Sequence, residues 1–278
     1  MLKFFRQIRY SLMETRNTTK YLKYAIGEII LVVIGILIAL SINNWNQNQN
    51  RLKKETVLLE QLKGELISIY NDVYTDLFQL MESEKSHLKV TDYMNQDLDY
   101  EEELCFDFGW LKLDEYLYPE TAVYNKIKDE GLDIIRNDSI RINLQYLYEN
   151  VFPRISRGSS FHPDISEYLD NFYTENFKLN KNYDLEYIIT LEKDSISDVI
   201  FPEDIRKFPL EFTLDEKTRQ YTFGYVPLDY EALKKDTKFQ MLLFQADDYR
   251  VYKIDYYKEA KSGIKKVVNL IDKILEKE

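Results

Sequence analysis

The stretch AIGEIILVVIGILIALSI, residues 25–42, decides how this chain is built. It contains one ionisable side chain, Glu28, and as a helix it would be about 27 Å long, close to the thickness of the hydrocarbon core of a bilayer. Tyr21 and Tyr24 precede the stretch and Trp45 follows it, and such aromatic side chains favour the two membrane interfaces. The sequence therefore predicts a transmembrane helix over 25–45, with these three residues as interface anchors.

Charges on either side of this helix predict its orientation. Residues 1–24 carry six basic side chains and one acidic side chain directly before the anchor, whereas on its far side the first basic residues, Arg51, Lys53 and Lys54, follow only after the neutral run NNWNQNQN. The rest of the chain is acidic overall, with 31 basic and 47 acidic side chains. The positive-inside rule then makes residues 1–24 a basic cytoplasmic tail and residues 46–278 an extracytoplasmic domain. In a bacterium with two membranes this places the protein in the inner membrane with its main domain in the periplasm. The tail is either a basic amphipathic helix on the membrane face or simply a solvated tail.

A cleaved signal peptide is the alternative interpretation of the apolar stretch. Ala39-Leu40-Ser41 has the small-x-small pattern of a cleavage site. However, the apolar core of a signal peptide has about 7–15 residues, and this one is longer. The length favours a retained anchor.

One face of the predicted transmembrane helix carries Glu28, Gly35 and Ala39. Their helical spacing places them together, and a small-xxx-small pair such as Gly35 and Ala39 allows another helix to approach closely. We expect this face to contact a second copy of the chain or another membrane protein. In the alternative interpretation, Glu28 only extends its carboxylate to the cytoplasmic interface.

Two long apolar stripes predict the fold of residues 46–278. The first begins after Trp45, keeps to one helical face and predicts a helix over about 44–95 that continues the anchor. The second follows Asp236, a capping residue, and predicts a long C-terminal helix. Each stripe needs a partner, so we expect a mainly α fold in which the last helix packs antiparallel against the first. Close helix contact is the expected reason for the mid-helix residues Gly64 and Gly263.

Shorter elements are predicted between the two long helices. Turn and capping residues delimit helices over about 120–129, 139–151, 164–179 and 230–235, with a loop that begins at Pro153. Residues 183–192 are predicted as a possible helix. Residues 208–226 alternate enough for a small β-hairpin.

Composition and motifs point to no reaction. The acidic body has no basic stripe, which argues against nucleic acid as a partner. Cys105 and the two histidines, His87 and His162, are too dispersed for a zinc-type cluster, and no nucleotide-binding or nucleophile motif is present. We expect a packed His87 and a buried structural Cys105. We also expect no catalytic residue, no metal and no cofactor.

Three segments resemble one uncharacterised family of single-pass membrane proteins from Bacteroidota-type bacteria. They are KYAIGEIILVVIGILIALSINNWN at 23–46, TAVYNKIKDEGLDIIRNDSIRINLQYLYE at 121–149 and VPLDYEALKKDTKFQMLLF at 226–244. The resemblance implies an inner-membrane location and a helical exterior domain. It implies no activity and supplies no catalytic residue.

These features together predict a membrane-anchored helical interaction or scaffold protein, in an oligomer or an envelope complex, that is not an enzyme. The alternative is an extracytoplasmic sensor of a ligand or peptide that signals through the transmembrane helix. Because only residues 1–24 are expected in the cytoplasm, such a sensor would need a partner there.

Overall fold

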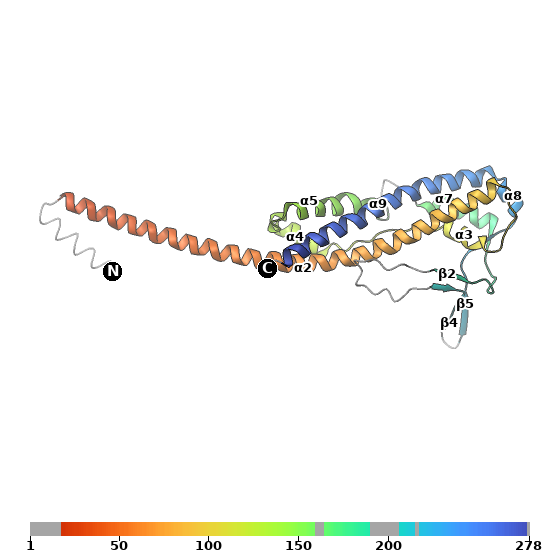
Figure 1. Cartoon of the computed structure of the whole chain (residues 1–278), viewed down its shortest axis with the longest axis horizontal. Coiled ribbons are helices and arrows are strands. Elements are labelled where there is room, and N and C mark those ends of the chain that lie inside the picture. The colour runs from red at the N-terminus through yellow and green to blue at the C-terminus, as the bar shows by residue number, and fades with distance from the viewer. Residues whose placement is uncertain (1–17, 159–163, 190–205, 215–216, 277–278) are drawn as a thin grey trace. The chain divides into compact units, whose positions relative to one another are not determined.

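The computed structural model describes residues 18–158, 164–189, 206–214 and 217–276 (Figure 1). Most of the expected basic tail lies outside these ranges, and so does His162. Packing divides the chain into one unit that ends at Val57 and a second that begins at Leu58, and each is described by itself.

Helices make up most of the described chain. Their bounds are α2 (Thr18–Asn95), α3 (Leu104–Leu111), α4 (Ala122–Glu130), α5 (Asp138–Tyr146), α6 (Phe152–Ile155), α7 (Ile165–Asn176), α8 (Tyr230–Lys234) and α9 (Thr237–Leu275), with a 3-10 turn η1 (Leu132–Ile134) and a π-helical turn η2 (Leu147–Val151). The expected mainly α fold is confirmed. The predicted helix over 44–95 is also confirmed, because α2 is continuous from the apolar stretch to Asn95.

Side-chain caps explain where several helices begin. The Asp236 carboxylate accepts hydrogen bonds from the backbone N–H groups of Lys238 and Phe239, so α9 begins where the sequence predicts. Asn137 caps α5 and Asp229 caps α8 in the same way. Each cap satisfies N–H groups that have no partner within the helix.

Within the second unit, α9 packs antiparallel against α2, as predicted (Figure 1). The order of the contacts gives the direction: Lys63 pairs with Asp272, Asp76 accepts from Tyr257, and His87 lies 3.5 Å from Asp247. Residue numbers rise along one helix as they fall along the other.

Two hydrophobic clusters fill the space between these helices and the shorter ones. The first joins the part of α2 from Leu58 to Leu80 and the part of α9 from Ile254 to Ile271 with α4, α5, η2 and α6. The second joins Val90 and the start of α9 with α3 and α7. Tyr257 lies in the first cluster with no exposed surface, and the partly buried Tyr256 packs at the edge of the cluster.

Within the described residues, six short strands form three antiparallel pairs. The pairs are β1 (Phe177–Leu179) with β6 (Tyr225–Pro227), β2 (Tyr187–Ile189) with β3 (Arg206–Phe208), and β4 (Leu210–Leu214) with β5 (Lys217–Tyr221). The third pair confirms the predicted hairpin. The helix predicted to reach Leu179 ends instead at Asn176, because the chain becomes extended at Phe177 and pairs with β6. The possible helix over 183–192 is likewise wrong where it is described, since Tyr187–Ile189 is a strand.

The loop expected to begin at Pro153 begins at Ser156 instead, since Pro153 lies inside α6 and the described residues after Ile155 are not helical. Proline lacks an N–H group and normally interrupts a helix. The π-helical turn before it changes the hydrogen-bond register, and the N–H of Phe152 donates to the carbonyl of Leu147 five residues back. Proline is tolerated at the first positions that follow such a change.

The two mid-helix glycines differ. A Cβ at Gly263 would lie 2.8 Å from Cδ2 of Leu147, so the expected close contact is confirmed there. At Gly64 no described atom outside the glycine's own stretch of helix lies within 4 Å of that position, and the expectation is wrong.

Candidate functional site

The apolar stretch lies on α2 with its side chains exposed. Among the residues that the structure describes, one helix is long and apolar enough to cross a membrane; its most apolar window has a mean hydropathy of 2.8 and none of that window is buried. Leu31 and Ile29 are 65% and 63% exposed, which is unusual for large aliphatic side chains in water.

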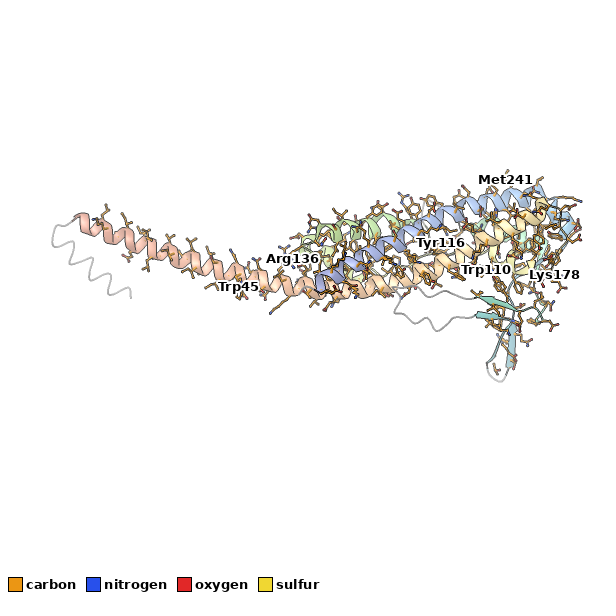
Figure 2. The ribbon with its side chains drawn as sticks, in the orientation of Figure 1. Trp45, Trp110, Tyr116, Arg136, Lys178 and Met241 are labelled. Carbon is orange, nitrogen blue, oxygen red and sulfur yellow. The ribbon has the colours of Figure 1, made fainter. Side chains whose placement is uncertain are left out.

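The predicted contact face lies within this exposed part of α2. No described atom lies within 4 Å of the position that a Cβ would take at Gly35. Glu28 and Ala39 share the helix with Gly35 at the predicted spacing. Trp45 is 64% exposed (Figure 2), and the side chains of Tyr21 and Tyr24 lie outside the described part. The face and the interface anchors therefore stay predictions.

A buried ion pair lies inside the second unit. The Lys253 ammonium on α9 pairs with the Asp114 carboxylate, and their side chains are only 2% and 4% exposed. Asp114 also accepts hydrogen bonds of 2.7 Å from the Tyr116 hydroxyl and from the backbone N–H of Ile165. Lys253 lies 3.9 Å from the centre of the Tyr116 ring. Burial of these charges is thus compensated by several polar partners.

Next to this pair, Arg250 of α9 bonds to α3 and to Asp247 of its own helix. Its side chain has no exposed surface, and it donates to the Leu111 carbonyl and to the Asp247 carboxylate over 2.9 and 2.8 Å. His87 lies on the other side of Asp247 and is largely buried, as expected. Burial lowers the pKa of His87; Asp247 opposes this change and Arg250 adds to it.

Asp76 of α2 is a half-buried carboxylate whose surroundings favour its neutral form. Burial, followed by repulsion from Glu115, raises its pKa from 3.8 to about 7, and this outweighs the lowering effects of the Tyr257 hydroxyl and Lys253. Together with Arg250, Lys253 and Asp114, it makes up what we call the polar layer. On α9 this layer lies between Ala246 of the second hydrophobic cluster and Ile254 of the first.

A cleft of about 560 Å³ opens beside the polar layer. Loop residues around Asp114, the start of α7 and the segment before β6 form its walls. Its charged lining residues are Lys112, Asp114, Arg157, Asp164 and Asp170. Tyr116, labelled in Figure 2, and Tyr225 contribute aromatic rings. The volume lies within the range of small-molecule sites.

A smaller cleft of about 380 Å³ lies by β1 and β6. Asn180 and Asn182 line it, but their side chains accept hydrogen bonds within their own loop, from the N–H groups of Asn182 and Asp184. These bonds are typical of a turn-forming role. Among the described residues, no group of three or more His, Cys, Asp or Glu side chains is arranged to hold a metal ion.

Cys105 lies on α3 with no exposed surface, in agreement with the expected buried cysteine. Burial, followed by the charges of Asp107, Glu103 and Glu102, raises the pKa of its thiol to about 12. The thiolate, which is the nucleophilic form, is therefore suppressed.

The model of a family described as "Family of unknown function (DUF6090)" matches residues 28–182, more than half of the chain. The chain belongs to the DUF6090 family. The matched part begins inside the apolar stretch and ends after β1, so it contains Asp114, Arg157 and Asp164 of the larger cleft. No curated protein and no solved structure matches the chain. Family membership therefore identifies the chain without assigning an activity.

Neither the polar layer nor the larger cleft was expected from the sequence. A signal for the layer was present on α9, where Arg250 and Lys253 occupy positions of the buried stripe between Ala246 and Tyr257. Charged residues on an otherwise apolar stripe indicate buried partners elsewhere in the chain. No local pattern marked the cleft, because its walls come from segments more than 100 residues apart.

Proposed function

We propose that this DUF6090 protein is a membrane-anchored helical interaction protein that acts in an oligomer or an envelope complex and has no catalytic role. The observation that carries the proposal is the exposed apolar part of α2, whose side chains have no partner layer within the described chain. A bilayer would cover such a surface. The six basic side chains of residues 1–24, against four among residues 46–65, support a cytoplasmic N-terminus and a main domain outside the inner membrane.

Membrane fractionation tests the anchor. We expect the full chain to stay with the membrane through washes in high salt and alkaline carbonate and to be released by detergent. In spheroplasts, protease added outside should digest residues 46–278 down to a resistant core. Recovery in the soluble fraction, or protection of the main domain from external protease, would contradict the anchor or its orientation respectively.

The contact face is tested by enlarging its small residues. Gly35→Leu with Ala39→Leu should reduce crosslinked oligomers or crosslinks to a membrane partner in native membranes, because the added side chains separate the helices. Val33 lies about 160° around the helix from Gly35. Val33→Leu is therefore the matched control and should leave the crosslinks unchanged. If both variants crosslink like the unmodified protein, helix contact does not use this face.

A second candidate function is an extracytoplasmic sensor that signals through α2 to a partner. The observation that favours it is the cleft of about 560 Å³ in the second unit, which offers a site for a ligand. The two functions differ in their crosslinked neighbours. Neighbours that change when a ligand is added support the sensor, whereas constant neighbours support the interaction protein.

A further inference from the structure

Most charges in the larger cleft already have partners. The Lys112 ammonium pairs with the Asp170 carboxylate over 2.8 Å and lies 5.3 Å from the centre of the Tyr225 ring. Asp114 pairs with Lys253 in the polar layer. These groups shape the walls, and their charges are compensated without a ligand.

Two charges of the same cleft differ from the others. Arg157 lies with its guanidinium 5.9 Å from the centre of the Tyr116 ring, and no described acidic side chain pairs with it. Asp164 precedes α7 at the capping position, yet its carboxylate accepts no hydrogen bond from the helix in the described structure. The cleft thus presents one cation and one anion that do not neutralise each other.

The surroundings of Asp164 make a positive partner favourable. Burial, followed by repulsion from Asp114, raises the pKa of Asp164; Lys253 opposes this change, and Glu167 and Asp170 add to it. An ammonium group close to this carboxylate would relieve that repulsion. Arg157 suits a carboxylate, because its planar guanidinium group can donate two parallel hydrogen bonds to the two carboxylate oxygens.

We propose that this cleft binds a ligand that carries both an ammonium and a carboxylate group, that is, a free amino acid or a short peptide with unblocked ends. The ammonium contacts Asp164 and the carboxylate contacts Arg157. Ser166 and Tyr116 also line the cleft. This inference goes beyond the membrane anchor and does not depend on it, because all of these residues belong to the second unit.

Calorimetric titration of the detergent-solubilised full chain tests the proposal, with three probes: alanine, trialanine, and trialanine that is acetylated and amidated. We expect alanine or trialanine to bind, and the blocked peptide to bind at least tenfold more weakly. Binding of alanine alone identifies free amino acids as the ligand class, and preferential binding of trialanine identifies peptides. Absence of binding by both unblocked probes at millimolar concentration overturns the proposal, as does equal binding of the blocked peptide.

Substitutions then assign the two charges. Arg157→Gln and Asp164→Asn should each weaken binding at least tenfold, whereas Arg219→Gln on β5 and Asp129→Asn on α4 are matched controls that should not. For trialanine acetylated at its N-terminus only, Asp164→Asn should cause no further loss, because the ammonium is already absent. A further loss would overturn the assigned pairing. Circular dichroism melting checks that each variant is folded, and membrane fractionation of the same variants keeps this result separate from the anchor.

Discussion

Lys253 and Asp114 keep opposite charges together in the interior, where an isolated charge would be very unfavourable. Asp114 is held by hydrogen bonds from Tyr116 and Ile165 as well as by the ammonium group, so it links the chain after α3 to the start of α7. A buried pair of this kind adds little net stability compared with apolar residues of the same size. Removing only one of the two partners, however, leaves an uncompensated charge in the interior and strongly destabilises the fold.

Removing the cation alone should therefore be costly. We expect Lys253→Met to lower the free energy of unfolding by about 3–5 kcal/mol, because Asp114 is left buried without its ion-pair partner. Adding Asp114→Asn should recover part of the loss. Lys258→Met, at an exposed position of the same helix, is the control and should change stability by less than about 0.5 kcal/mol. Chemical denaturation in detergent measures all four proteins.

Asp76 should make stability depend on pH. Its pKa is about 7 in the folded protein against an ordinary value of 3.8, so the folded state binds this proton more tightly than the unfolded chain does. The stabilising contribution of the protonated form is complete below about pH 4 and is lost as the pH rises through about 7.

Asp76→Asn mimics the protonated form and can still accept from the Tyr257 hydroxyl. We expect it to stabilise the protein by about 1 kcal/mol or more at pH 8 and to have little effect at pH 4. Thermal melting at the two pH values, with Asp129→Asn as the exposed control, measures the difference. An equal effect at both values would contradict the raised pKa.

At the level of whole elements, the sequence predicts structure where local signals are strong. Asn137, Asp229 and Asp236 are capping residues in the sequence and caps in the structure, and both long helices follow their apolar stripes. The failures come from distant partners. Phe177–Leu179 pairs with a strand about 50 residues later. In α3 every residue except Asp107 is buried, so the helix has no apolar stripe to detect.

The two mid-helix glycines provide a test at this scale. Gly64→Ala should stabilise the protein by about 0.5–1 kcal/mol, because alanine favours the helix and its Cβ enters open space. Gly263→Ala gains the same helix preference but forces the buried Leu147 side chain to move, and overpacking costs about 1–3 kcal/mol. The change in the free energy of unfolding should therefore have opposite signs at the two positions. Stabilisation at both positions would contradict the close contact at Gly263.

At the scale of the whole second unit, two hydrophobic clusters of the described residues lie on either side of the polar layer along α9. Apolar stripes alone would allow α9 to slide along α2 by a turn. Polar contacts oppose this: the Tyr257 hydroxyl donates to Asp76 of α2, and Arg250 and Lys253 hold α9 to the Leu111 carbonyl and to Asp114. The sequence predicts the pairing of the helices, but the register and the cleft depend on contacts between segments that no local pattern connects.

Hydrogen exchange should report this organisation. We expect the amides of α2 from Leu58 to Leu80 and of α9 from Ile254 to Ile271 to exchange only on global unfolding, because they lie in the first cluster. The β4–β5 hairpin should exchange by local opening, since every residue of β5 is exposed. Mass spectrometry of peptic fragments over a denaturant series measures both. Equal protection of hairpin and cluster would contradict the assignment.

Cys105 has a practical consequence for mapping how the protein sits in the cell. Cys105 is the only cysteine in the chain. Because its sulfur is buried and protonated, we expect it not to react with maleimides in the folded protein. The unmodified protein should therefore give no labelling signal of its own. A single cysteine introduced in turn at each exposed position would be the sole reactive group, and an impermeant reagent would report directly which compartment that position faces.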